Sequence, residues 1–242
     1  MALLEAKNIH KRFGQQVVLE KINIAFEENQ LSGIVGPNGA GKTTLFNILT
    51  GEHQPTPHMG QIIFDGKDIT RYSRHRVAQL GIARSFQMMN LFDEFTALEN
   101  IMVALPDLRG RQFNMRMNVP INSAIQDEAY KILRHIGLHK VARSEARNLS
   151  YGNRRALEIG VALASKPRML FLDEPTQGLG SDQMNNLIDL IHKLKNDVTI
   201  VVIEHDMDFL AKIADVISVM LWGQIIATDA PEKLLANRGV LQ

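Results

Sequence analysis

The sequence predicts an α/β protein with a parallel β-sheet, a small β layer near the N-terminus and a helical insertion in the middle. Two stretches, 169–174 and 198–206, are mostly apolar and have the length of buried strands. Between them, the segment from Met184 to Ile191 carries apolar residues at i, i+3, i+4 and i+7, and Ser181 is a suitable N-cap for that helix. Apolar strands that alternate with amphipathic helices are typical of a parallel sheet covered on both faces.

The N-terminal β layer is predicted from two further patterns. Ile22, Ile24 and Phe26 alternate with polar or small residues, which is the period of a half-buried strand. Residues 61–69, QIIFDGKDI, have the composition of a strand that meets an Asp-Gly turn. Both patterns indicate a small sheet on the N-terminal side of the chain.

The middle of the chain, from Met88 to about Leu149, shows helix signals and no convincing strand. Apolar residues from Ile125 to Ile136 form one helical stripe. The stretch 106–123 is predicted to be a loop, because glycine and proline interrupt it. We infer a helical subdomain inserted into an α/β core.

A glycine-rich loop joins the strand at 31–35 to the next helix. Its sequence, GPNGAGKT at 36–43, matches the pattern G-x-x-x-x-G-K-[ST]. Glycines let backbone N–H groups surround phosphate oxygens, and a helix N-terminus adds positive potential. We expect Lys42 to contact the terminal phosphates of ATP, Thr43 to bind Mg²⁺ and Thr44 to contact an inner phosphate. The expected phosphate-binding residues are Gly36, Pro37, Asn38, Gly39, Ala40, Gly41, Lys42, Thr43 and Thr44.

Two carboxylates follow a later apolar strand. This strand delivers Asp173 to its C-terminal end, where open α/β sheets bind their ligands. We expect Asp173 to hold Mg²⁺ through water and Glu174 to orient or deprotonate the attacking water. Taken alone, the two motifs have simpler interpretations: a glycine-rich turn with an exposed lysine, and carboxylates that are solvated or cap a helix. Their presence in one chain favours nucleotide hydrolysis.

Composition excludes several other classes of protein. The formal net charge of the 242 residues is +1, which gives no reason to expect a general nucleic-acid binder. The chain has no cysteine, so disulfides and thiolate chemistry are excluded. The N-terminus lacks a signal-peptide pattern, and no apolar run approaches the roughly 18–20 residues that span a bilayer. We expect the protein to reach a membrane only through a partner.

The order of the motifs resembles one family, the ATP-binding-cassette (ABC) ATPases. The phosphate loop is followed by SFQ with Gln87, then LSYGN at 149–153, then FLDEP, then IEHD with His205. None of the last four motifs is specific alone, but together they are. The resemblance covers essentially the whole chain.

This resemblance implies a fold and a domain plan. The fold is a P-loop NTPase (RecA-like) core with a parallel sheet, an N-terminal antiparallel β subdomain and an inserted α-helical subdomain. One domain would span residues 1–242. Its ATP-binding core with the β subdomain would lie at 1–86 and 151–242, and its helical subdomain at 87–150.

LSYGN resembles the signature motif of the family, usually written LSGGQ. In the family, the Ser hydroxyl and the free N–H groups of this helix start cover the γ-phosphate held by a partner chain in a head-to-tail dimer. Ser150 and Gly152 are carried over as these contacts, whereas Tyr151 and Asn153 depart from the pattern. Gly180 also departs from it, because the family usually has an acidic or amide residue there. Without the other motifs, this stretch would be an ordinary Ser-capped helix start.

Three further residues are carried over by position. Phe13 stands where the family stacks an aromatic ring on adenine, Gln87 where it senses Mg²⁺ and water, and His205 where it contacts the γ-phosphate. Their simpler interpretations are a core aromatic, a polar surface residue and a structural histidine. The implied cofactors are ATP and Mg²⁺. The implied catalytic residues are Glu174, His205, Lys42 and Gln87, and the implied metal ligands are Thr43, Gln87 and Asp173.

Within the family, stretches such as 149–179 and 203–234 resemble the ATP-binding subunits of branched-chain amino acid importers. Subunits for urea or short-amide import and for lipopolysaccharide export share parts of the pattern. The resemblance implies a homo- or heterodimer of ATPase subunits, transmembrane permease subunits and, indirectly, a substrate-binding protein, without nucleic acid. The location implied is peripheral, on the cytoplasmic face of the inner membrane.

Two alternative functions belong to other classes of protein. A soluble ABC ATPase of DNA repair or translation usually fuses two cassettes or carries coiled-coil or zinc insertions, whereas this chain has one cassette and no cysteine. A P-loop kinase would need an acceptor pocket and has no use for a signature motif. Formation of ADP and phosphate without a phosphorylated acceptor would exclude the kinase.

Overall fold

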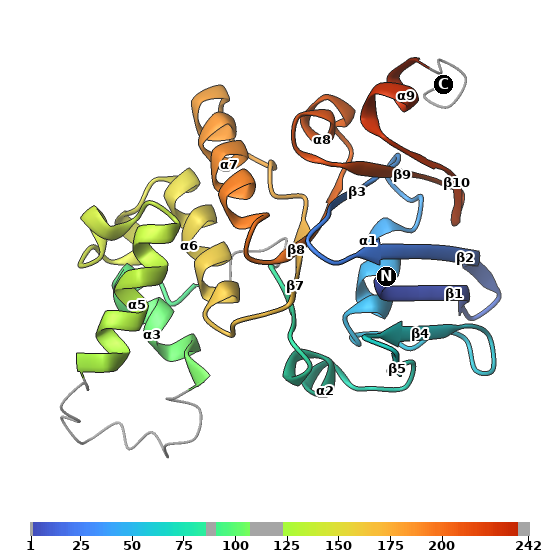
Figure 1. Cartoon of the computed structure of the whole chain (residues 1–242), viewed down its shortest axis with the longest axis horizontal. Helices are drawn as coiled ribbons and strands as arrows, with labels where there is room; N and C mark the ends of the chain where they lie inside the picture. The colour runs from blue at the N-terminus through green and yellow to red at the C-terminus, as the bar shows by residue number, and fades with distance from the viewer. Residues whose placement is uncertain (1, 86–90, 107–122, 237–242) are drawn as a thin grey trace. The chain divides into compact units, whose positions relative to one another are not determined.

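The computed structural model describes residues 2–85, 91–106 and 123–236 (Figure 1). The chain divides into two units. The first unit comprises residues 1–84, 168–175 and 191–242, and the second comprises 85–167 and 176–190. The second unit thus takes in parts of the chain that the sequence analysis grouped with the core, and the domain boundaries stay a prediction.

The first unit contains an antiparallel sheet at the N-terminal side. Its strand order is β2-β1-β4-β5, and every neighbouring pair is antiparallel. Asp65 (φ +50°) and Gly66 (φ +73°) make the turn between the last two strands, as expected for an Asp-Gly hairpin. The antiparallel β subdomain is therefore confirmed. The strands are β1 (Ala2–Phe13), β2 (Gln16–Glu27), β4 (Gln61–Phe64) and β5 (Lys67–Asp68).

A second, six-stranded sheet has the order β10-β9-β3-β8-β7-β6. Its strands run parallel except for β10, which is antiparallel to β9. Every residue of β3, β7 and β8 is buried, which explains why these strands are continuous apolar runs rather than alternating ones. The strands are β3 (Leu31–Val35), β6 (Ile82–Arg84), β7 (Met169–Asp173), β8 (Thr199–Glu204), β9 (Val216–Leu221) and β10 (Gln224–Asp229).

An aromatic cluster forms part of the core of this unit. The ring of Phe171 on β7 meets the ring of Phe46 edge-on at 4.9 Å and that of Phe26 at 6.3 Å, a favoured aromatic geometry. The three rings therefore tie the helix after the phosphate loop to strands of both sheets. The helices of the unit are α1 (Lys42–Leu49), α2 (Arg74–Gln79), α8 (Met207–Ile213) and α9 (Pro231–Ala236).

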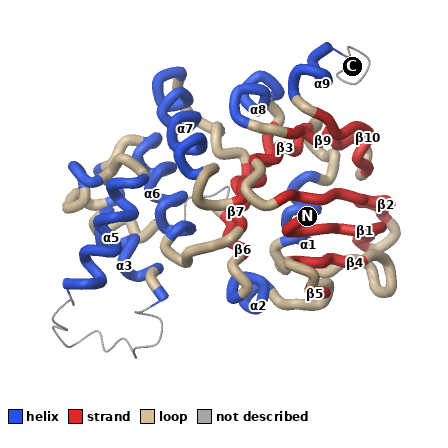
Figure 2. The backbone as a smooth tube through the Cα atoms, viewed as in Figure 1, coloured by secondary structure: helices blue, strands red, loops and turns tan. Residues whose placement is uncertain are grey.

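The second unit is helical over its described residues (Figure 2). Its helices α3 (Ala97–Ala104), α5 (Ser123–His135) and α6 (Tyr151–Leu163) pack on one another. The packing is tight around Gly160 of α6, where a Cβ atom would lie 2.5 Å from the side chain of Ile136 and 3.0 Å from that of Ile101. The short 3-10 helices are η1 (His139–Val141) and η2 (Ala146–Asn148), and α7 (Ser181–Leu194) begins in this unit and ends in the first.

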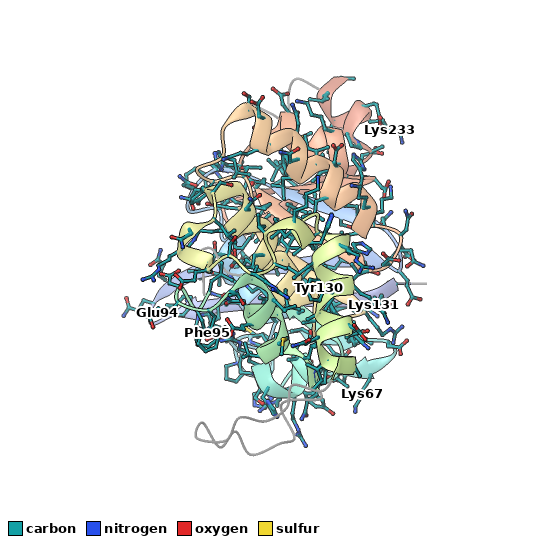
Figure 3. All side chains as sticks on the ribbon, turned by 90° about the vertical axis from the view of Figure 1, so that its left-hand side faces the viewer. Lys67, Glu94, Phe95, Tyr130, Lys131 and Lys233 are labelled. Carbon is teal, nitrogen blue, oxygen red and sulfur yellow. The ribbon has the colours of Figure 1, made fainter. Side chains whose placement is uncertain are left out.

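The predicted helical stripe of α5 is confirmed, because Ile125, Ala129, Leu133 and Ile136 are all buried. A pair of aromatic rings lies on the surface of the same unit. Phe92 and Phe95 stack with their centroids 5.1 Å apart, and both are exposed; Phe95 is labelled in Figure 3.

Two strands end earlier than the sequence predicts. Strand β7 ends at Asp173, because Glu174 takes a left-handed conformation (φ +43°) that leaves the strand. Strand β8 ends at Glu204 rather than Asp206, because the Asp206 side chain accepts a hydrogen bond of 3.0 Å from the Phe209 backbone N–H and so caps α8. In both cases an acidic residue, Glu174 or Asp206, lies just beyond the C-terminal end of the strand, where the candidate site is found.

Candidate functional site

The phosphate loop runs from the end of β3 to the start of α1 and is held tightly against main chain. A Cβ atom on Gly36 would lie 2.1 Å from the Met220 carbonyl oxygen, so only glycine fits there. Gly41 caps α1 in a left-handed conformation (φ +99°), which glycine adopts without strain. The loop therefore presents backbone N–H groups at the start of an eight-residue helix, as phosphate binding requires.

Lys42 is buried inside this loop, with 4% of its surface exposed. Its Nζ donates to the carbonyl oxygens of Gly36 at 2.6 Å and Pro37 at 3.1 Å. Burial lowers the pKa of Lys42 below its ordinary value of 10.5, and the carboxylates of Glu174, Glu204 and Asp173 oppose that shift. The simpler interpretation, a turn with an exposed lysine, is wrong.

The turn between β9 and β10 supports the loop from one side. The N–H of Gly223 donates to the Ala40 carbonyl at 3.0 Å, and the Gly223 carbonyl accepts from the Glu20 N–H at 2.9 Å. Trp222, the one tryptophan of the sequence, sits on this turn with φ +49° and is 85% exposed. The phosphate loop and an exposed indole are thus joined through neighbouring residues.

The sheet topology brings the catalytic candidates of the first unit to one edge. Strand β8 pairs in parallel with β3 and β7, with Val35 opposite Glu204 and Asp173 opposite Ile203. Because parallel strands end on the same side, the phosphate loop, Glu174 and His205 all follow from this edge. This is the position at which open α/β sheets bind ligands.

Asp173 is 1% exposed and forms an ion pair with Arg84 at 2.5 Å. The Arg84 guanidinium also bonds to the Asn47 side chain on α1 and lies 5.9 Å from the Phe46 ring. Sequence reasoning missed Arg84, because only the pairing of β6 with β7 places it beside the carboxylate. The sequence signal, a charged residue at the end of a short and only partly buried strand, is recognisable only once the strand pairing is known.

Glu174 is half-buried, and its backbone N–H donates to the Ile203 carbonyl at 3.0 Å. Its left-handed backbone is uncommon for a residue with a side chain, and strain of this kind is concentrated at functional sites. His205 follows β8 with its side chain 58% exposed and its Nδ1 3.5 Å from the fully buried Glu204 carboxylate. An acid and an imidazole are therefore both available at the sheet edge.

Phe13 lies at the end of β1 and is 47% exposed, so it is not a core aromatic. Its ring meets His53 edge-on at 5.7 Å, and Lys11 Nζ lies 5.0 Å from its centroid. A ring held in this way keeps surface for another planar group to stack on.

The remaining predicted residues lie outside the first unit. Ser150 is the N-cap of α6 in the second unit, and its Oγ accepts a 3.3 Å hydrogen bond from the Asn153 N–H. Gly152 is in the first turn of the same helix and packs against Gln183. Gln87 lies outside the described residues, as does most of the predicted loop 106–123.

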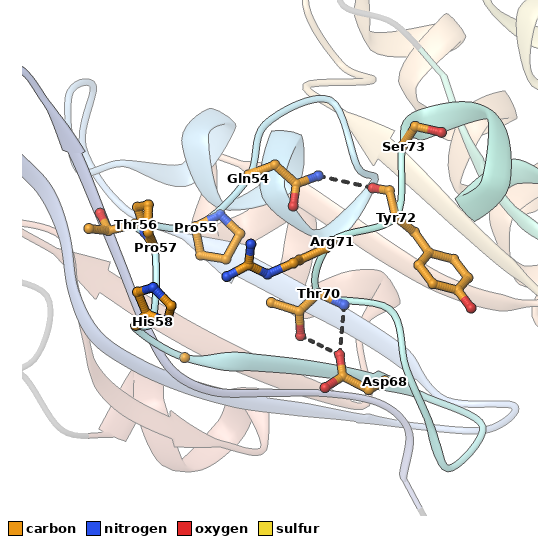
Figure 4. Close-up of a pocket in the computed structure, with 11 residues that line it drawn as sticks. Gln54, Pro55, Thr56, Pro57, His58, Asp68, Thr70, Arg71, Tyr72 and Ser73 are labelled. Atoms are coloured by element: carbon orange, nitrogen blue, oxygen red, sulfur yellow. Dashed lines mark hydrogen bonds between the residues drawn. The ribbon is translucent and has the colours of Figure 1, made fainter.

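A cavity of about 610 Å³ lies in the first unit, and no predicted site residue lines it. Figure 4 shows Asp68 in this cavity, where its carboxylate accepts from the Thr70 hydroxyl (2.5 Å) and N–H (2.9 Å), and Gln54 donating to the Tyr72 carbonyl at 3.0 Å. Hydrogen bonds from Thr70 and Gln61 lower the pKa of Asp68. The Asp68 carboxylate is therefore already an acceptor of hydrogen bonds from neighbouring residues of the same unit.

No helix within the described ranges is long and apolar enough to cross a membrane.

Comparison with known proteins agrees with the motif order. The model of the family "ABC transporter" matches residues 19–177. The high-affinity branched-chain amino acid transport ATP-binding protein BraF of Pseudomonas aeruginosa is 37% identical, over 99% of this chain and 96% of the relative.

Solved structures agree with the fold. The ADP conformation of an ATP-binding cassette of an ABC transporter superimposes with a TM-score of 0.88 at 30% identity, covering 100% of this chain and 97% of the other. A dimeric ATP-binding cassette in a post-hydrolysis state with ADP and Pi gives 0.77 at 26% identity, covering 94% and 98%. The chain belongs to the ABC transporter family, as one of its ATP-binding cassettes.

Proposed function

We propose that this chain is the ATP-hydrolysing subunit of an ABC importer for branched-chain amino acids. The observation that carries the proposal is the single sheet edge that combines a buried Lys42 in a phosphate loop with Asp173, Glu174 and His205. BraF supports the transport role, because its name states branched-chain amino acid transport. The alternative of a DNA-repair or translation ATPase has no observation in its favour.

In this proposal the loop amides and Lys42 bind the β- and γ-phosphates, and Phe13 stacks on the adenine ring. The Glu174 carboxylate takes a proton from the attacking water, and His205 donates to the γ-phosphate, so that charge developing there is stabilised. Burial lowers the pKa of Lys42, and the carboxylates of Glu174, Glu204 and Asp173 act against that shift. ADP and phosphate are the products.

A divalent cation fits the donors at the sheet edge. The hydroxyl of Thr43 and the carboxylate of Asp173 are hard oxygen ligands of the kind that Mg²⁺ prefers, and Gln87 is the third proposed ligand. Asp173 already forms an ion pair with Arg84, so we expect it to hold the cation through a bridging water molecule. Bound Mg²⁺ would neutralise charge on the β- and γ-phosphate oxygens.

The signature residues Ser150 and Gly152 complete the proposed mechanism in a second copy or a similar chain. Ser150 is exposed at the N-terminus of α6, where the helix dipole favours an anion. A dimeric cassette is among the solved structures that this chain resembles. We propose that ATP closes such a dimer on the cytoplasmic face of the inner membrane, that hydrolysis reopens it, and that transmembrane permease subunits use the motion, with a substrate-binding protein supplying the cargo.

The test is capture of the complex with a tagged Glu174→Gln variant, trapped with ATP and extracted from membranes by mild detergent. Two multispanning proteins and a second ATPase, or a second copy, should be recovered together. Recovery of soluble proteins or nucleic acid alone would contradict the transport role. A parallel assay should find ADP and phosphate formed by the wild-type complex and not by the variant.

A further inference from the structure

Tyr151 stands where the signature motif usually has glycine, and the structure shows what its side chain does. It is the first residue of α6, and its hydroxyl donates a 2.9 Å hydrogen bond to the main-chain carbonyl of Gln177. Its ring lies 3.0–3.1 Å from the point where a Cβ atom on Gly178 would stand. The backbone of Gly178 is in the left-handed region (φ +80°) and carries no side chain. The Tyr151 ring therefore packs directly against the main chain at 177–178.

A second contact lies beside the first. A Cβ atom on Gly152 would lie 3.1 Å from the side chain of Gln183, and Gln183 Oε1 accepts a 3.3 Å hydrogen bond from the Gly180 N–H. The consecutive signature residues Tyr151 and Gly152 therefore both lie against the segment 177–183. All of these residues belong to the second unit.

The segment 177–183 follows strand β7 and Glu174 closely in the chain. Gln177 follows Glu174 by three residues, and the division between the units falls between Pro175 and Thr176. Three residues span at most about 10 Å even when extended, and proline fixes one backbone dihedral of this connection. A displacement of the α6 N-terminus would therefore be transmitted to the left-handed Glu174 within a few residues.

We infer that Tyr151 is a positioning residue that couples the signature turn to Glu174 within one chain. It fixes the 177–178 main chain, so that a phosphate bound by the α6 N-terminus and the carboxylate that activates water move together. This inference rests on the proposed function. It assigns a purpose to one departure from the family pattern, since the Tyr151 ring packs against the main chain at Gly178.

The first test compares Tyr151→Phe with wild type in steady-state ATP hydrolysis. One hydrogen bond is lost and the ring is kept, so kcat should fall about two- to tenfold. KM, nucleotide affinity and the melting temperature should stay close to wild type. Tyr130→Phe on α5 is the matched control and should change none of these quantities. An unchanged kcat, or a change in KM alone, would overturn the inference.

A second variant tests the packing of the Tyr151 ring against Gly178. Gly178→Ala should also lower kcat, because the added methyl group meets the Tyr151 ring. In a Tyr151→Ala background the same change should have a smaller effect, because the ring is gone, and such coupling is what a double-mutant cycle measures. Independent effects would show that the two residues do not act through one contact.

Failure of the coupling and failure of the proposed function are distinguishable. If the wild-type complex forms no ADP, the proposed function is wrong. The contact is then judged by amide hydrogen exchange, in which segment 176–183 should exchange several-fold faster in Tyr151→Phe than in wild type and Tyr130→Phe. Equal exchange in all three proteins would overturn the contact as well.

Discussion

The phosphate loop of the first unit and the signature turn of the second (LSYGN, 149–153) both place a helix N-terminus beside small residues. The atoms that surround these small residues differ between the two. Gly36 faces a main-chain carbonyl at 2.1 Å from its missing Cβ, whereas Gly152 faces the flexible side chain of Gln183 at 3.1 Å. Lys42 is buried, whereas Tyr151 is 43% exposed. The loop is thus a rigid receptor made of backbone, and the signature turn is adjusted by side chains that can differ between members of the family.

The largest effect should come from Glu174→Gln, which breaks the chemistry of the first region alone. An amide cannot take the proton of water, so hydrolysis should fall at least about 100-fold while ATP still binds. Phosphate release and nucleotide binding measure the two properties separately. Glu52→Gln, an exposed partner of Arg74, is the control and should hydrolyse ATP normally. Turnover near wild type in Glu174→Gln would remove Glu174 from the proposed role.

Arg84→Met should have the next largest effect, on stability. It removes the cation that faces the buried Asp173 carboxylate, and loss of one partner of a buried pair costs about 3–5 kcal/mol. Denaturant unfolding measures the change. Arg74→Met removes an exposed partner of Glu52 and should cost less than about 1 kcal/mol. Equal losses in the two variants would mean that burial does not distinguish these pairs.

Alanine substitutions at Gly36 and Gly152 directly test the contrast between main-chain and side-chain surroundings. Gly36→Ala forces a methyl group against the Met220 carbonyl and should cost about 1–3 kcal/mol. Gly152→Ala meets only the Gln183 side chain and gains helix propensity of up to about 1 kcal/mol, so its stability should be unchanged or higher. Thermal unfolding of both variants decides the matter. A larger loss at Gly152 would reverse the comparison.

The smallest effect is expected at Asp68, in neither region. Hydrogen bonds from Thr70 hold the pKa of Asp68 below its ordinary value of 3.8. A lowered carboxyl pKa stabilises the fold above pH 3.8, and that stability is lost as the pH falls through the lower folded value. Because the group is exposed, Asp68→Asn should cost only a few tenths of a kcal/mol at pH 7. The difference in melting temperature between variant and wild type should shrink below pH 4 and not grow.

The sequence predicted those parts of the fold that depend on local pattern. The apolar runs of β7 and β8, the α5 stripe and the Asp65–Gly66 hairpin are all present, because strand burial, helix period and turn chemistry are written into neighbouring residues. The phosphate loop was predictable for the same reason. Its pattern requires only a strand before it and a helix after it.

Features that depend on contacts between segments far apart in the sequence were not predictable. Arg84 and Asp173 are 89 residues apart and meet only because β6 pairs with β7. Tyr151 and Gln177 are 26 residues apart, and nothing local shows that the hydroxyl reaches a main-chain carbonyl. The left-handed Glu174 likewise follows from how its N–H meets Ile203 on the neighbouring strand.

The turn that supports the phosphate loop gives this protein an intrinsic optical probe. All indole emission of the chain comes from Trp222, and this ring is 85% exposed, so collisional quenchers in the solvent can reach it. The next residue, Gly223, is hydrogen-bonded to Ala40 of the loop. We therefore expect nucleotide binding to change the indole fluorescence of the unlabelled protein, and we expect a partner that covers this turn to shield the same ring from quenchers.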